Sequence, residues 1–488
     1  MDWFYNDDLA TLRWFAEADA GRLRPWDLPD LWNNEHPVGA QFALLWLARR
    51  ALGLDMRAFV GLSVVVVALT AAMAARLAAD ARDPVAIRCA AVAACFALAF
   101  QPTQTEHLLW SFELGWFVVN AVVVADAVMT ERFGPRAVWP AAALCAAASL
   151  ASAQGAFAFF AAALHQALMP ARPGRRTAAA GLALGGVLVV AHLLWRPHAS
   201  ASAAARPDHA FGGMVVYAVE VLGGQFGLRG RLPLLLAGSA LLAAAVVLLW
   251  RRRRTLRPDR LRCALVLMGF SGLCLAAFAQ GRHHLGLDWA TASFHAAPLL
   301  VPFALGLAVL LGAPPAAAPT RRRLDRAASA ATVLLLASAT AAAVPYGVTR
   351  ARLWAMDRGY ARWATCSGAV PELVAARGSG VDYDLAGFAL VRPLATQMCA
   401  APAGPLEAAL VRRPPLFDAL AAGRPEVDRA LDALWQDYAT DPKLQLAFKP
   451  WRSDTPVRLL AFAEAEKGSE IEPGRLTRDA DIHRGPAP

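Results

Sequence analysis

Long apolar runs between residues 58 and 346 constrain the fold of this chain more than any other feature. Apolar segments of 15 to 20 residues recur there, and only 18% of the whole chain is charged. Soluble domains are about 25% charged. A helical segment of this length and composition can cross the hydrocarbon core of a bilayer. The sequence therefore predicts an all-α polytopic membrane protein.

We expect about ten transmembrane helices. Three arginine-rich tracts, beginning at Arg172, Arg251 and Arg321, all fall on one side when the spans alternate, as the positive-inside rule requires. Both ends of the chain are then outside. The expected spans are 58–77, 87–101, 111–130, 137–152, 155–170, 177–196, 232–250, 262–280, 294–312 and 327–346.

Two outside regions flank the transmembrane bundle at 58–346. Residues 1–57 are predicted to form an acidic loop, with an interfacial helix at 37–52 whose apolar run is interrupted by Arg49 and Arg50. Residues 347–488 contain all three lysines and no apolar span, which predicts a small outside domain with a disordered tail. A long outside N-terminus usually follows another span, so we expect that one helix is missing before Met1.

The net charge of +10 does not indicate a nucleic-acid partner, because the arginines are concentrated in short tracts between apolar segments and so report membrane topology. Two of the seven cysteines, Cys366 and Cys399, lie in the polar C-terminal region. They can pair if that region faces an oxidising compartment, and the sequence leaves this open. The other five lie in apolar segments, where cysteine usually serves as a small hydrophobic residue.

Asp7 and Asp8 are the first candidates for chemistry. They follow Asn6, so one interpretation is that Asn6 caps a helix and both acids favour its first turn. The alternative is that one of them is a general base at the membrane surface, because a carboxylate within hydrogen-bond reach can deprotonate a hydroxyl group.

Glu106 and His107 follow in the next outside loop. Thr103 and Glu106 fit a capping box, which explains the glutamate structurally. We also expect Glu106, Trp110 and Glu113 to share one helix face. Acids that enter a span are costly and therefore suggest function, so the loop is a second candidate site.

Arg282 and His283 lie at the predicted outer end of the 262–280 span. They can reach the lipid head groups without any further role. Alternatively, Arg282 can hold a lipid phosphate, for which its forked guanidinium is suited. His36 in the first loop can join this cluster or bind a metal, although a lone histidine usually does neither. No residue spacing in the chain resembles a zinc motif.

Three segments, NDD, WNNEHPVGAQFALLW and QPTQTEHLLWSFELGWFVVN, carry a resemblance that covers roughly residues 1–130. This region resembles an uncharacterised bacterial branch of the glycosyltransferase C superfamily, whose members are membrane enzymes that use polyprenyl-phosphate-linked sugars. The resemblance implies a multi-pass protein of the bacterial inner membrane. Its partners would be a lipid-linked sugar donor and membrane lipids.

The same resemblance implies roles for individual residues. Asp7 or Asp8 would be the catalytic base, and Glu106 the acid of the second loop. Arg282 would face the carrier phosphate. Members of the superfamily differ in whether they need a divalent metal, so the cofactor stays open. The chain departs from the family pattern at 293–295, where an arginine is expected after the serine, and this puts the phosphate site in doubt. The remaining candidates for substrate binding are Glu35, His36, His107 and His283.

Two other classes of function compete with a transferase. A transporter or flippase should place polar groups deep in several spans, and the candidates for that are Glu113, Asp126, His165 and His192. A non-catalytic scaffold for envelope assembly would tolerate loss of Asp7 and Asp8. The sequence fixes neither the sugar, nor the acceptor, nor the oligomeric state.

Overall fold

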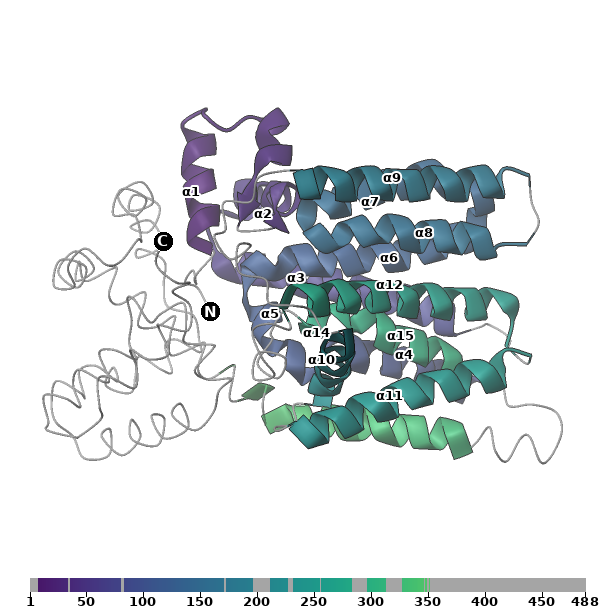
Figure 1. Ribbon diagram of the computed structural model, residues 1–488. Coiled ribbons are helices and arrows are strands. Elements are labelled where there is room, and N and C mark those ends of the chain that lie inside the picture. The colour runs from purple at the N-terminus through teal and green to yellow at the C-terminus, as the bar shows by residue number, and fades with distance from the viewer. Residues whose placement is uncertain are drawn as a thin grey trace, which may run out of the picture.

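The computed structural model describes residues 8–33, 36–79, 83–170, 173–195, 211–226, 231–254, 256–282, 296–312, 327–345, 347, 348 and 351. The described part is mostly helical, and long helices lie side by side in one bundle, with α1 and α2 at one end of it (Figure 1). The expected C-terminal domain, Cys366, Cys399 and all but three residues of 347–488 lie outside the described residues.

The bundle consists of helices that run between its two ends, together with short helices that enter from one end. One further helix, Ala327–Pro345, follows α15. The labelled helices are α3 (Met56–Ala78), α4 (Val85–Ala99), α6 (Leu114–Phe133), α7 (Val138–Ala151), α8 (Ala156–Leu168), α9 (Arg175–Trp195), α10 (Phe211–Gly223), α11 (Arg231–Arg252), α12 (Pro258–Arg282), α14 (Ala296–Leu299) and α15 (Val301–Leu311).

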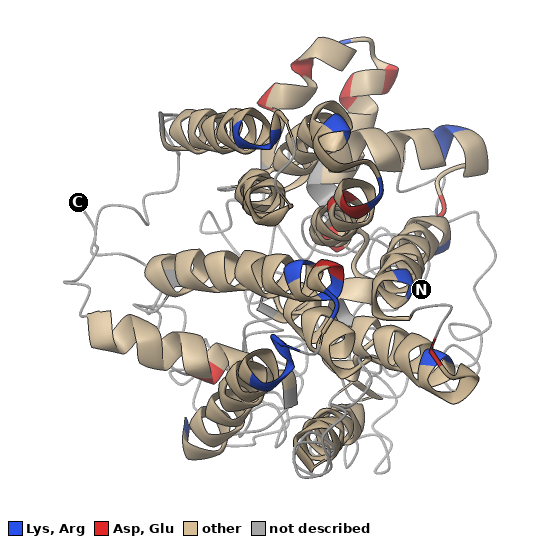
Figure 2. Cartoon of the chain, turned by 90° about the vertical axis from the view of Figure 1, so that its right-hand side faces the viewer, with Lys and Arg blue, Asp and Glu red and all other residues tan. Residues whose placement is uncertain are grey.

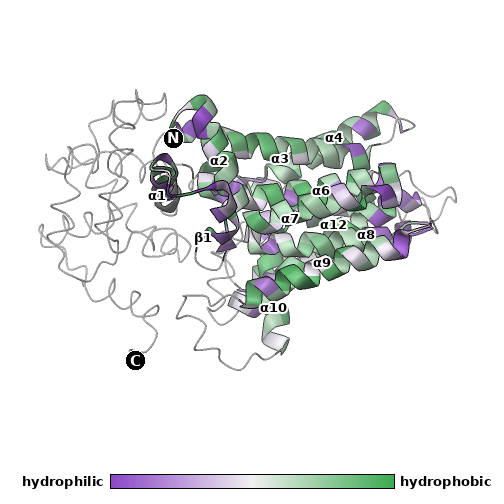
Figure 3. Cartoon of the chain, turned by 90° about the horizontal axis from the view of Figure 1, so that it is seen from above, coloured by the Kyte–Doolittle hydropathy of each residue, from purple (hydrophilic) through white to green (hydrophobic). Residues whose placement is uncertain are grey.

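Seven helical stretches of the described chain are long and apolar enough to cross a membrane. This agrees with the expected all-α multi-pass membrane protein, and the apolar colouring of the bundle is evident in Figure 3. One stretch, Ser111–Ala151, contains both α6 and α7, joined by the 3-10 turn Gly134–Ala137. At 1.5 Å per residue the 14 residues of α7 reach only about 21 Å, against about 30 Å of hydrocarbon. Length and composition therefore do not establish the expected count of ten.

Helix α6 lies at the centre of the bundle and packs against α3, α7, α8 and α12. Its buried side chains include Phe117, Val123 and Val124, which belong to one large apolar core with residues of the neighbouring helices. Polar ties support this packing, since Asn120 donates a hydrogen bond to the carbonyl of Pro298 at 2.8 Å. Helix α6 therefore links neighbours on several sides of the bundle.

A second, smaller apolar core lies at the end where α1 and α2 stand. We call this end the outer cap. It joins the first loop, which contains α1, α2 and a two-residue antiparallel ladder, to the second loop. Its elements are α1 (Asp8–Asp19), η1 (Pro25–Asp30), β1 (Trp32–Asn33), β2 (His36–Pro37), α2 (Gly39–Leu52), η2 (Pro102–Gln104), α5 (Thr105–Leu109) and η3 (Ser111–Glu113).

The helix expected at 37–52 is present as α2, and it ends at Gly53, whose φ of 82° suits glycine. It begins two residues late because Pro37 pairs with Trp32 in the ladder. Phe42 and Leu45 are buried in α2, whereas Leu52 at its end is 65% exposed. Arg49 does more than interrupt the apolar run, because it bonds Asp19 of α1 at 2.5 Å.

The opposite end of the bundle is rich in arginine. Figure 2 looks onto this end and shows arginines, in blue, at the helix termini that face the viewer. We call it the arginine end. The arginines of the helix ends there are Arg76, Arg132, Arg175, Arg252, Arg260 and Arg262.

Candidate functional site

A break in the helix shapes the second loop of the outer cap. α5 stops at Leu109 because Trp110 takes an extended backbone conformation (φ −102°, ψ 106°). The chain then forms η3 before α6 begins at Leu114. This break folds Glu113 back toward α5, so that its carboxylate approaches His107.

His107 and Glu113 form the most deeply buried ionisable pair of the outer cap among the described residues. Nδ1 of His107 lies 3.7 Å from Oε2 of Glu113, and the two side chains are 0% and 3% exposed. Neither ring nitrogen of His107 makes a hydrogen bond. Burying a polar group without a partner is costly, so an imidazole beside a carboxylate here is a candidate for proton transfer or ligand binding.

Buried amide side chains hold the two loops around this pair. Gln41 of α2 accepts a hydrogen bond from the backbone N–H of Gly115 at 3.2 Å, which ties the first loop to the start of α6. Gln104 donates to the carbonyl of Ala297 at 3.1 Å, which ties the second loop to α14. The loops are thus fixed to the bundle by hydrogen bonds as well as by the apolar core.

His36 lies in the same cap. Its ring makes an edge contact with the ring of Trp116 on α6, with 5.8 Å between the centroids. α1 also packs on η3, so the helix that begins at Asp8 touches the loop that carries Glu113. An acidic first loop, two histidines and a buried glutamate therefore share one end of the bundle.

The structure describes the side chains of only two predicted site residues, His36 and His107, and both lie in the outer cap. Asp8 and Glu106 lie in α1 and α5, and Arg282 is the last residue of α12. Their side chains are outside the described part. Asp7, Glu35 and His283 lie outside it altogether.

Two expectations for the second loop are wrong. Thr103 does not cap a helix: it lies inside η2, and its hydroxyl makes no hydrogen bond. α5 starts at Thr105 instead, whose hydroxyl donates to the carbonyl of Pro102 at 2.7 Å. Nor do the acids share one helix face, because the break at Trp110 separates α5 from Glu113.

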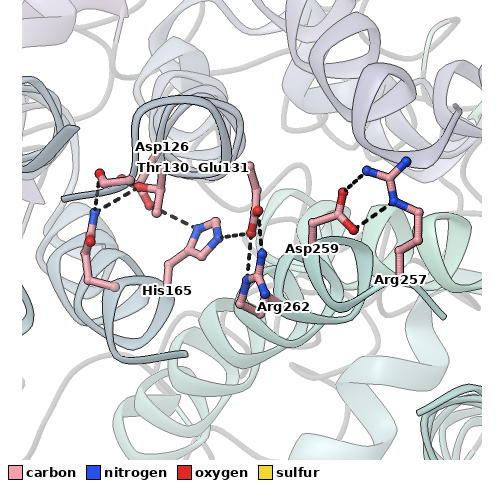
Figure 4. A network of polar contacts seen from close by, with 9 residues as sticks. Asp126, Thr130, Glu131, His165, Arg257, Asp259 and Arg262 are labelled. Atoms are coloured by element: carbon pink, nitrogen blue, oxygen red, sulfur yellow. Dashed lines mark hydrogen bonds and ion pairs between the residues drawn. The ribbon is translucent and has the colours of Figure 1, made fainter. Parts of the chain in front are cut away.

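Figure 4 shows a polar network at the arginine end. Its members Asp126 and His165 were candidates for a transport path, but the sequence did not predict that they meet Glu131 and Arg262. There Nε2 of His165 on α8 lies 2.8 Å from Oε1 of Glu131 on α6. Arg262 of α12 donates two hydrogen bonds to the same carboxylate, at 2.9 and 2.6 Å. Asp126, one turn before Thr130, accepts a hydrogen bond from that hydroxyl at 3.3 Å.

This network joins three helices whose polar residues are more than 30 positions apart, so no local pattern could have revealed it. The pairing of His107 with Glu113 was missed for a different reason. Six residues do not bring two side chains together on a continuous helix, and the break at Trp110 was not foreseen.

Comparison of the chain with protein-family models, curated protein sequences and solved structures found no match.

Proposed function

We propose that this membrane protein is a glycosyltransferase that moves a sugar from a polyprenyl-phosphate-linked donor to an acceptor of the cell envelope. One observation supports this above all. The acidic first loop packs onto the second loop, which carries the buried pair of His107 and Glu113, at the end of the bundle opposite the arginine end. A lipid-linked donor needs such a place, where polar groups lie at the surface of an apolar bundle.

The chemistry follows from charge. Asp7 or Asp8 would take the proton from the acceptor hydroxyl as it attacks the sugar. The carrier phosphate would leave, and cationic groups such as Arg282 and His283 would stabilise its negative charge. Glu35 and His36 of the first loop, with Glu106 and His107 of the second, would bind the substrates.

The topology that goes with this proposal has about ten spans and both ends outside. The arginine end then faces the cytoplasm by the positive-inside rule, and the outer cap faces the periplasm of a bacterial inner membrane. The short helices α7, α8 and α15 would complete the ten spans, and the region 347–488 would lie on the side of the outer cap.

A transporter is the competing proposal, and the network of Asp126, Glu131 and His165 is the observation that favours it. Its carboxylate Glu131 is already held by Arg262, however, which suits a structural tie between helices. The described ionisable groups gather toward the two ends of the bundle, whereas a transport path needs them near its middle.

The test is complementation of a deletion strain with the wild type and with Asp7→Asn, Asp8→Asn, Glu106→Gln and Glu113→Gln. Loss of a catalytic base typically costs about 10²- to 10⁴-fold in rate. We expect loss of an envelope glycan and accumulation of the lipid-linked sugar in at least one of the aspartate variants. Membranes would be assayed with added Mg²⁺, with added Mn²⁺ and with chelator, since the metal requirement is open.

Glu17→Gln is the matched control, because Glu17 lies on α1 and pairs with Arg22 away from the buried core. It should keep full activity at the wild-type protein level. Unchanged glycans in all four carboxylate variants would overturn the transferase and favour a scaffold. Loss of a transported solute with normal glycans would favour the transporter.

A further inference from the structure

Three potential metal ligands from three helices meet at the arginine end. They are Glu131 of α6, His165 of α8 and Cys263 of α12, and one ligand atom from each lies within 4.8 Å of the others. Histidine and cysteine are buried, and glutamate is half-buried. The residues are far apart in sequence, so the absence of a zinc-like spacing does not bear on this cluster.

Two buried polar atoms beside the cluster make no hydrogen bond. Asp126 Oδ2 and His165 Nδ1 are buried, 3.9 Å apart, and neither makes a hydrogen bond. Each is almost inaccessible, with 3% and 0% of its side chain exposed. Buried polar atoms are rarely left without partners. While Nε2 of His165 bonds Glu131, Nδ1 and the carboxylate of Asp126 face each other without a hydrogen bond.

The charges of the cluster also suit a divalent cation. Asp126 and Glu131 carry two negative charges when ionised, and Arg262 offsets one of them. A thiolate at Cys263 would bring the sum to minus two, which one divalent ion neutralises. Metal binding would break the S–H bond of Cys263, release its proton to solvent and form a metal–sulfur bond.

We propose that Glu131, His165 and Cys263 bind a divalent transition metal of the zinc type. Thiolate and imidazole are the ligands that zinc prefers, whereas magnesium and calcium prefer oxygen. Ligand atoms in a tetrahedral zinc site lie about 3.3–3.8 Å from one another, which follows from bonds of about 2.0–2.3 Å. The three atoms therefore need to adjust by about 1 Å.

The surroundings match those of histidine ligands in proteins. A metal-bound histidine usually donates its second ring N–H to a carboxylate, which orients the ring. With Nε2 of His165 on the metal, Nδ1 faces the carboxylate of Asp126. Asp126 is in turn fixed by the hydroxyl of Thr130. Asp126 is therefore a positioning residue. In the metal-bound protein its Oδ2 would accept a hydrogen bond from Nδ1 of His165, so that neither buried atom lacks a partner.

Arg262 does not prevent this arrangement. Its Nη2 bonds Oε2 of Glu131 at 2.6 Å, so Oε1, on the side of His165, can turn to the metal while Oε2 stays with the guanidinium. The shorter of the two Arg262 bonds is the one that is kept. Glu131 would then join α6 to α8 through the metal and to α12 through Arg262.

The experiment titrates the purified full-length protein with Co²⁺, which takes zinc sites and gives a sulfur-to-cobalt charge-transfer band when a thiolate binds. We expect one Co²⁺ per chain, the charge-transfer band, and loss of both on addition of Zn²⁺. Cys263→Ala should remove the band. Asp126→Asn should keep it and weaken affinity by about 10- to 100-fold, as for other residues that orient a ligand.

Cys274→Ala is the matched control, because Cys274 is also buried on α12 but lies three turns further along. It should bind Co²⁺ like the wild type. His165→Ala should also lose Co²⁺ binding. If that variant does not fold, Cys263→Ala still decides the question, because alanine is tolerated at a small buried apolar position. A band that persists in Cys263→Ala, or no binding above the level of an adventitious ion, would overturn the site. The outcome is independent of the glycan assay, which reports the outer cap.

Discussion

The two ends of the bundle combine packing and ion pairs in different proportions, and the outer cap contains the bond between Arg49 and Asp19 beside its apolar core. In the outer cap, aromatic side chains supply the core: Phe15 of α1 contacts Phe42 of α2 and Phe59 of α3, with ring centroids 5.4 and 5.9 Å apart. At the arginine end, charged groups supply the ties. Arg262 bonds Glu131 at 2.6 Å, and Arg260 bonds Asp83 at 2.5 Å.

This difference indicates which polar groups support the structure and which are available for chemistry. Where packing holds the elements, polar groups need not be consumed by structure, and His107 keeps both ring nitrogens without a hydrogen bond. At the arginine end, Glu131 is held by His165 and Arg262, and Asp83 by Arg260, each from another element. We therefore propose the outer cap as the site of the reaction. At the arginine end, the described buried atoms without a hydrogen bond include Oδ2 of Asp126, Nδ1 of His165 and Oε1 of Gln166.

The largest effect on stability should come from breaking an ion pair at the arginine end. Arg262→Ala leaves Glu131 without its guanidinium in a site where their side chains are only 12% and 16% exposed. Loss of one partner of a buried pair costs about 3–5 kcal/mol of unfolding free energy. Chemical unfolding in detergent would measure it.

Arg257→Ala is the control for that prediction. Its pair with Asp259 is 2.6 Å long but 52% and 31% exposed, and exposed pairs contribute about 0–1 kcal/mol. Equal losses in both variants would show that burial does not distinguish the ion pairs of this end.

A smaller and more local effect is expected in the outer cap. Phe15→Ala removes a fully buried ring from the second apolar core and should cost about 3 kcal/mol. Because this core is distinct from that of the bundle, hydrogen exchange should accelerate in α1 and α2 and stay unchanged in α12. Trp26 is 68% exposed, so Trp26→Ala should change neither the stability nor the hydrogen exchange of α1 and α2. Uniform acceleration in Phe15→Ala would mean that the cap and the bundle unfold as one unit.

The smallest effect concerns the junction of cap and bundle. A Cβ at Gly115 would lie 2.3 Å from the carbonyl oxygen of Ala151 and 2.5 Å from Oε1 of Gln41, so Gly115→Ala must displace α7 or the first loop. Overpacking of this kind costs about 1–3 kcal/mol. Thermal unfolding followed by size-exclusion chromatography would report the loss.

Gly61→Ala on α3 is the matched change, because nothing lies within 4 Å of its added Cβ. Alanine in a helix interior is favoured over glycine by about 0.5–1 kcal/mol, so this variant should be slightly more stable. A loss of stability at Gly61 comparable to that at Gly115 would show that close packing at Gly115 is not the cause.

Local patterns predicted much of the bundle and little of the candidate sites. Apolar runs marked the long helices and the segment 37–52 that became α2, because hydrophobicity acts within a few residues. The break at Trp110 had no such mark. It depends on how the second loop packs against α1 and α3, which residues near 110 do not specify alone.

The sequence by itself determined that this is a helical multi-pass membrane protein, since a bilayer accepts apolar segments whose backbone hydrogen bonds are satisfied internally. It also placed three arginine-rich tracts in the connections between those segments. Only the tertiary structure decided which polar groups meet. His107 reaches Glu113 through a broken helix, and Glu131 meets His165 and Cys263 across three helices. Such encounters depend on the packing of distant elements, which no local pattern encodes.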